Sequence, residues 1–177
     1  DMLLIEGYIG PDSSFRTGSR LYIEATQPNI AGMQSQLYFP SDEDWSPDFT
    51  VVYTPSLAAP GKPDDRLIIV DLENWVTRVF GSDYFGESKM GGLRMWNRLV
   101  YDRGGLACHA GLKTYPPSST RSGQEESMLI IGLSGTGKTT TTFRRQAESL
   151  PVQDDFVAIM PGGNVFTTEA GCFAKTY

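Results

Sequence analysis

The chain has 177 residues, 40% of them hydrophobic and 20% charged, which is enough for one globular domain and excludes wholesale disorder. Its 15 Lys and Arg against 21 Asp and Glu give a net charge of −6, which argues against a nucleic-acid partner held by phosphate contacts. The charge is uneven, because residues 1–88 hold 14 acids and 5 bases whereas residues 89–177 hold 7 acids and 10 bases. The positive balance of the second half suits a small anionic ligand.

Cysteine content and hydropathy indicate the compartment. Cys108 and Cys172 are too few for a disulfide framework, and the chain does not open on a signal peptide. No apolar run approaches the roughly 20 residues of a membrane-spanning helix. We therefore expect a soluble, cytoplasmic protein with no membrane partner.

The first two thirds of the chain are expected to be rich in strands. Apolar runs bounded by Gly, Pro, Asp or Ser lie at residues 2–5, 21–23, 49–53, 67–70 and 75–80. The last two are joined by residues 71–74, which predicts a hairpin. Apolar spacings of three and four predict a helix over 28–38 that begins at Pro28, and a second helix within 82–101 whose start is weakened by Gly91 and Gly92.

The last third changes pattern. Residues 113–127 are rich in Pro, Ser, Gly and charge, which predicts an exposed loop or linker. An apolar strand over 128–131 then leads through a glycine-rich turn into a helix from about 138 to 150. Such a unit needs a parallel sheet, for which residues 156–160 and 164–166 can supply strands.

The turn at residues 132–139, GLSGTGKT, satisfies the phosphate-loop pattern in full and stands between a predicted strand and a predicted helix. In such a loop the backbone N–H groups and the helix start face the phosphates, Lys138 reaches the outer phosphates and Thr139 offers a hydroxyl to magnesium. The alternative is a glycine-rich turn with a chance lysine, against which the flanking elements argue. We therefore predict a nucleoside triphosphate ligand.

Other polar residues carry less information by themselves. Asp154 and Asp155 follow Lys138 closely, and adjacent carboxylates near a triphosphate are natural ligands of divalent cations. On spacing alone a turn or a helix cap is the commoner role of such a pair. His109, the single histidine, is by the same standard more often a bystander than a ligand, and Lys89 fits a solvated helix lysine.

Several short blocks of the sequence form one pattern: Tyr84-Phe85-Gly86-Glu87-Ser88-Lys89, Trp96-Asn97, Gly104, His109, GLSGTGKTT, Asp154-Asp155, and EAGCFAKT at 169–176. In order and approximate spacing these blocks resemble ATP-dependent phosphoenolpyruvate carboxykinase, and the last is similar to that family's E-G-G-C-Y-A-K-T. Fainter similarity at residues 7–20 and 49–71 extends the resemblance over essentially the whole chain.

The resemblance implies a reaction in which oxaloacetate and ATP give phosphoenolpyruvate, carbon dioxide and ADP, with two divalent ions. It implies that Thr139 holds the Mg²⁺ of the nucleotide, and that His109 and Asp155 bind a second ion, usually Mn²⁺, with Asp154 as a further metal candidate. The implied nucleotide-binding residues are Gly132, Leu133, Ser134, Gly135, Thr136, Gly137, Lys138, Thr139 and Thr140.

The substrate side follows from the same resemblance. Tyr84 would line the substrate pocket, and Lys89 would place a positive charge near the substrate or the transferred phosphate. Lys89, Lys138 and Lys175 are the implied catalytic residues. The expected fold is α/β, with a β-rich part (1–112) that carries the substrate and metal residues, a linker (113–127) and a phosphate-loop nucleotide-binding part (128–177) of carboxykinase type.

The chain departs from the family in four respects. Where the family has a second lysine that binds manganese, this chain has Met90, whose thioether is a poor ligand for that ion. The residues after His109 read Ala-Gly-Leu in place of C-S-A-N, and the linker is several residues longer. The family's enzymes are also several times longer, so we expect this chain to be part of a longer protein and to be inactive alone.

Two alternative functions remain open. One is a phosphate-loop kinase acting on another small molecule or on a protein hydroxyl, such as the histidine-containing phosphocarrier kinase. The other is a non-catalytic nucleotide-binding homologue.

Overall fold

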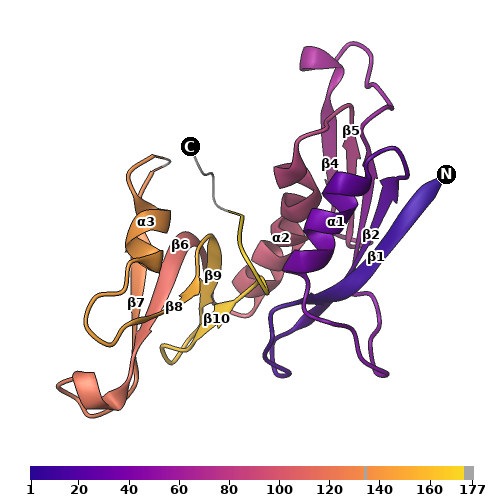
Figure 1. Ribbon diagram of the computed structural model, residues 1–177. Coiled ribbons are helices and arrows are strands. Elements are labelled where there is room, and N and C mark those ends of the chain that lie inside the picture. The colour runs from indigo at the N-terminus through magenta and orange to yellow at the C-terminus, as the bar shows by residue number, and fades with distance from the viewer. Residues whose placement is uncertain (134, 174–177) are drawn as a thin grey trace.

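A computed structural model describes residues 1–133 and 135–173, in which two β-sheets and the helices packed on them form a mixed α/β architecture (Figure 1). The α/β class expected from the sequence is therefore confirmed. Short 3₁₀ turns occur at Pro63–Asp65 and Pro117–Ser119. No helix in the described ranges has an apolar stretch of the length needed to cross a membrane.

The first sheet has the strand order β1-β2-β3-β5-β4. The two parallel pairings, β2 with β3 and β3 with β5, lie in the middle, and the two edge pairings are antiparallel. The predicted hairpin at 71–74 is confirmed, because the Asp71 carboxylate accepts hydrogen bonds from the backbone N–H groups of Glu73 and Asn74, each at 3.0 Å. The strands are β1 (Met2–Ile9), β2 (Thr17–Glu24), β3 (Phe49–Thr54), β4 (Leu67–Asp71) and β5 (Val76–Phe80).

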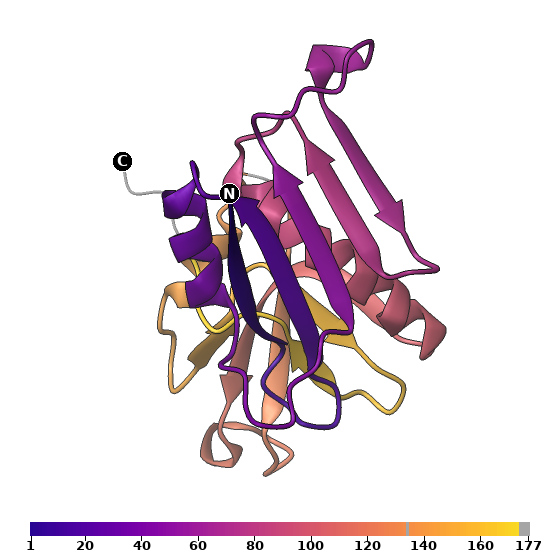
Figure 2. The same ribbon diagram turned by 90° about the vertical axis from the view of Figure 1, so that its right-hand side faces the viewer.

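Helices α1 (Pro28–Leu37) and α2 (Phe85–Asp102) cover one face of this sheet, and α2 lies between the two sheets (Figures 1 and 2). The helices bury alternate strand residues, including Leu21, Val51 and Val79, against Trp96 of α2. The predicted helices are thus confirmed, and α2 continues without a break through its glycines. A Cβ on Gly91 would lie 2.7 Å from Val51 Cγ1, so glycine there permits the close approach of helix and sheet.

The second sheet is organised around the long strand β6 (Leu106–Tyr115). The first half of β6 pairs with β9 (Phe156–Ile159), and its second half pairs with β7 (Glu126–Ile131) and β8 (Leu150–Gln153). The last strand, β10 (Val165–Thr167), pairs with β9. All these pairings are antiparallel, so the predicted parallel sheet is wrong. The physical reason is that β6 returns into β7 through residues 116–125, a direct connection that joins antiparallel neighbours.

Three element boundaries differ from the expectations. Strand β6 extends three residues into the 113–127 segment, and β7 takes its last two. Helix α3 (Lys138–Phe143) ends well before the predicted residue 150, because the backbone of Arg144 is already extended (φ −69°, ψ 114°) and Leu150 begins β8. Residues 139–142 are all threonine, whose β-branched side chains do little to prolong a helix.

Candidate active site

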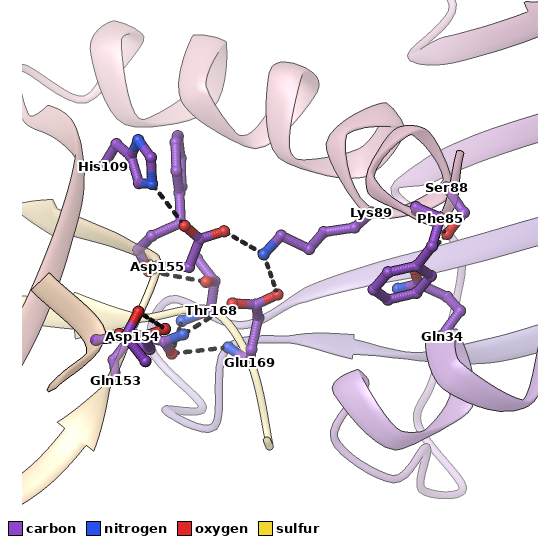
Figure 3. A network of polar contacts seen from close by, with 12 residues as sticks. Gln34, Phe85, Ser88, Lys89, His109, Gln153, Asp154, Asp155, Thr168 and Glu169 are labelled. Atoms are coloured by element: carbon purple, nitrogen blue, oxygen red, sulfur yellow. Dashed lines mark hydrogen bonds and ion pairs between the residues drawn. The ribbon is translucent and has the colours of Figure 1, made fainter. Parts of the chain in front are cut away.

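Asp154 and Asp155 lie in the two-residue connection between β8 and β9, where they link two groups of side chains (Figure 3). The strands on both sides pair with β6, and the backbone carbonyl of Asp155 accepts a hydrogen bond from the N–H of Ala110 at 3.0 Å. The turn is therefore fixed against the middle of β6. From this position Asp154 faces the glycine-rich loop, and Asp155 faces α2 and β6.

Asp154 contacts the first turn of α3. The hydroxyl of Thr139 donates a hydrogen bond to Asp154 Oδ2 at 3.0 Å. The other oxygen, Oδ1, is buried and has no hydrogen-bond partner among the described residues. A buried carboxylate oxygen is stable only when it is bonded, so this position suits a cation coordinated by Asp154 and Thr139.

Asp155 gathers a histidine and a lysine from two other elements. His109 Nε2, on β6, lies 2.7 Å from Asp155 Oδ1, and the ammonium of Lys89, on α2, pairs with Asp155 Oδ2. The imidazole is more than half exposed (59%) and is therefore accessible to a ligand. The structure thus brings together three of the residues singled out in the sequence (Figure 3).

Glu169 is a further member of this cluster, which the sequence reasoning did not assign as a site residue. It follows β10, is only 8% exposed, and its Oε1 lies 2.9 Å from Lys89 Nζ. Gln153, next to Asp154, holds it: Gln153 Nε2 donates to Glu169 Oε2 at 2.8 Å, and the Glu169 N–H donates to Gln153 Oε1 at 3.1 Å. The available signal was its place as the first residue of the EAGCFAKT block.

Burial and mutual charge set the protonation of this cluster. Burial raises the pKa of Glu169, and Lys89 only partly offsets this. Burial also opposes ionisation of Asp155 and of Lys89, but in each case the opposite charges prevail. Lys89 and His109 lower the pKa of Asp155, whereas Glu169 and Asp155 raise the pKa of Lys89. Lys89 and Asp155 are therefore charged near neutral pH, and Glu169 is the carboxylate that most readily takes up a proton.

The loop between β7 and α3 closes around the backbone carbonyl of Leu133. That oxygen accepts hydrogen bonds from the Thr136 hydroxyl at 2.7 Å and from Lys138 Nζ at 3.4 Å. Gly135 and Gly137 have φ values of 77° and 93°, a left-handed conformation that glycine adopts without strain. The loop therefore depends on its glycines for its shape.

The other residues predicted for the site lie away from the cluster around Asp155 or outside the residues that the structure describes. Tyr84 precedes α2 and is 69% exposed, and its backbone carbonyl accepts a hydrogen bond from the Tyr53 hydroxyl at 3.0 Å. Thr140 is exposed on α3, and Gly132 is the first residue after β7. Ser134 and Lys175 lie outside the described residues. Met90 packs against the principal hydrophobic core.

Metal-binding capacity is limited in the cluster around Asp155. His109 and Asp155 supply one nitrogen and one carboxylate, both suitable for a divalent ion. Within residues 1–133 and 135–173, no group of three or more His, Cys, Asp or Glu side chains is arranged to hold a metal. A second ion at His109 and Asp155 would therefore depend on water or substrate for its other ligands.

Comparison with known proteins places this chain in a family. The family described as phosphoenolpyruvate carboxykinase matches residues 1–177. The chain is 35% identical to the phosphoenolpyruvate carboxykinase (ATP) of Aeropyrum pernix, with 87% of this chain and 32% of that protein covered. The enzymes of the same name from Brevibacillus brevis and Geobacillus thermodenitrificans are 28% and 30% identical, each over 99% of this chain and 32% of their own length. The chain thus spans about a third of the length of these relatives. It belongs to the phosphoenolpyruvate carboxykinase family.

Proposed function

We propose that this chain forms the catalytic centre of an ATP-dependent phosphoenolpyruvate carboxykinase, which converts oxaloacetate and ATP to phosphoenolpyruvate, carbon dioxide and ADP. The observation that carries the proposal is the Asp154–Asp155 turn. One aspartate bonds Thr139 beside the glycine-rich loop, and the other bonds His109 and Lys89. A nucleotide subsite and a substrate subsite would therefore meet at two adjacent residues, as phosphoryl transfer between two bound molecules requires.

The nucleotide subsite is the loop from Gly132 to Thr140, within a nucleotide-binding part formed by residues 128–177. Its left-handed glycines curl the backbone in the manner by which N–H groups would face phosphate oxygens, and Lys138 would move from the Leu133 carbonyl to the outer phosphates. Thr139 and Asp154 Oδ1, which has no hydrogen-bond partner in the described part of the chain, would hold Mg²⁺ bound to ATP.

The substrate subsite lies in the preceding part, residues 1–112, which residues 113–127 connect to the nucleotide side. His109 and Asp155 have the donor chemistry for a second divalent ion, for which Mn²⁺ is our assignment. When bound, such an ion supplies Lewis-acid stabilisation of negative charge that develops on the substrate. Tyr84 would reach the substrate from its exposed position before α2.

The reaction balances in two steps. In the first step, the carbon–carbon bond that joins the leaving carboxylate to the rest of oxaloacetate breaks. Carbon dioxide departs, and the electron pair of that bond passes into an enolate. The enolate oxygen then attacks the terminal phosphorus of ATP, and the bond from that phosphorus to the bridging oxygen breaks to release ADP. Lys89, held between Asp155 and Glu169, would keep a positive charge beside the reacting groups, and Lys138 and Lys175 would neutralise the phosphates.

The test is an assay of the full-length protein with oxaloacetate, ATP, Mg²⁺ and Mn²⁺, in which phosphoenolpyruvate and carbon dioxide are both measured. We expect the two products in equal amounts, and we expect Lys138→Ala to reduce their formation by about 100-fold or more. Lys62→Ala, on an exposed loop residue, is the matched control and should act like the wild type. Consumption of ATP without release of carbon dioxide would contradict the proposal and favour a kinase of another substrate.

A further inference from the structure

Lys113 is a buried lysine with an unusual partner. It lies on β6, is 1% exposed, and forms no ion pair with a carboxylate of the described residues. Its ammonium donates a hydrogen bond to the backbone carbonyl of Arg144. A buried ammonium without a counter-charge is costly, and an apolar side chain of similar length would fill the same space at lower cost.

The carbonyl that Lys113 contacts lies at the C-terminal end of α3. Arg144 is the residue that caps the C-terminus of this helix, and its own N–H bonds the Thr140 carbonyl at 3.0 Å. A lysine ammonium at this end satisfies a carbonyl that the helix leaves without a partner, and it complements the negative end of the helix dipole. The helix has only six residues, four of them threonine, so it depends on contacts of this kind.

A second contact joins the same strand face to the same helix. Gly111 lies two residues before Lys113 and therefore on the same side of β6. A Cβ on Gly111 would overlap the hydroxyl of Thr142, which is fully buried in α3. The backbone of β6 thus touches the helix at Thr142, while Lys113 holds its end.

We propose that Lys113 is a positioning residue for the nucleotide subsite, in which its ammonium anchors the end of α3 and so fixes Thr139 opposite Asp154. The expected effect on nucleotide binding rests on the proposed function, whereas the anchoring of α3 by Lys113 does not depend on it. Thr139 and Arg144 are separated by little more than one helical turn, so a displaced helix end shifts the hydroxyl that meets Asp154.

The anchoring is tested by hydrogen–deuterium exchange on the full-length protein, with Lys113→Met as the variant and Lys62→Met as the matched control on an exposed lysine. The amides of Thr141 and Arg144, which bond within α3, should exchange about tenfold faster in Lys113→Met. The thermal midpoint should not fall, because methionine replaces a buried charge without a counter-charge. Unchanged exchange at these amides would overturn the anchoring.

The positioning is tested by kinetics on the same variants. We expect Lys113→Met to raise the KM for ATP about tenfold and to leave the KM for oxaloacetate within about twofold, with partial recovery in Lys113→Arg. Equal increases in both KM values, or faster exchange with an unchanged KM for ATP, would overturn it. Failure of the proposed function has a different signature, because the wild-type protein would then release no carbon dioxide from oxaloacetate in the presence of ATP, whatever the exchange data show.

Discussion

Replacing Lys89 by methionine tests the charge network at the centre of the site. The change removes the ammonium that pairs with Asp155 and Glu169 and retains a side chain of similar length. Glu169 is then left almost fully buried without a counter-charge among the residues that the structure describes. Removal of one partner from a buried ion pair typically costs about 3 to 5 kcal/mol, and Asp155 keeps His109 as a partner, so we expect about 3 kcal/mol at pH 8.

The loss should depend on pH because Glu169 can escape by protonation. Burial already holds its pKa above the ordinary value of 4.5, and removal of Lys89 raises it further. A carboxyl whose pKa is higher in the folded state contributes its stability at low pH and loses it as the pH rises through the folded-state pKa. The destabilisation caused by Lys89→Met should therefore be small near pH 5 and should grow toward pH 8.

The assay is urea unfolding of the full-length protein at pH 5 and pH 8, with Lys62→Met as the control on an exposed lysine. The double variant Lys89→Met/Glu169→Gln removes both charges and should recover most of the free energy of unfolding at pH 8. Our account would be refuted if Lys89→Met lost the same free energy at both pH values, or if Glu169→Gln added a further loss to it.

Two further tests concern the hydroxyl of Thr139 and a pair of helix glycines. Thr139→Val removes the hydroxyl that bonds Asp154 and should raise the dissociation constant of MgATP about tenfold, measured by calorimetry, whereas Thr139→Ser should bind like the wild type. Two helix glycines should respond in opposite directions when each is replaced by alanine. Gly32→Ala in α1 meets open space and should stabilise by about 1 kcal/mol, whereas Gly91→Ala meets Val51 and should destabilise by about 1 to 3 kcal/mol in urea titrations. A stabilising Gly91→Ala would disprove the packing explanation.

Most local elements could be predicted from the chain itself. Apolar runs bounded by Gly, Pro, Asp or Ser located the strands of the first sheet, Pro28 marked the start of α1, and the apolar stripe of α2 was visible despite its glycines. The glycine-rich loop was predicted between a strand and a helix, and it does lie between β7 and α3. These features depend on residues within a few positions of one another.

The assembly of those elements was decided by contacts between distant residues. The sequence alone indicated a parallel second sheet, yet β6 pairs only with antiparallel neighbours in the described chain. Gly91 counts as a helix breaker by propensity, but contact with Val51 makes it the residue that fits. Periodicity reports which face of an element is buried, and it does not report which partner covers that face.

The sequence by itself determined the chemistry available to this protein: a complete phosphate-loop motif, a single histidine, an adjacent aspartate pair and Lys89 in an order that resembles one family. Only the tertiary structure decided how these groups act on one another. It placed Glu169 against Lys89 and buried Lys113 beneath the end of α3, and neither of these contacts can be read from the neighbouring residues in the chain. The physical reason is that ion pairs and close packing depend on distances in space, which the folded strands and helices set between residues far apart in the chain.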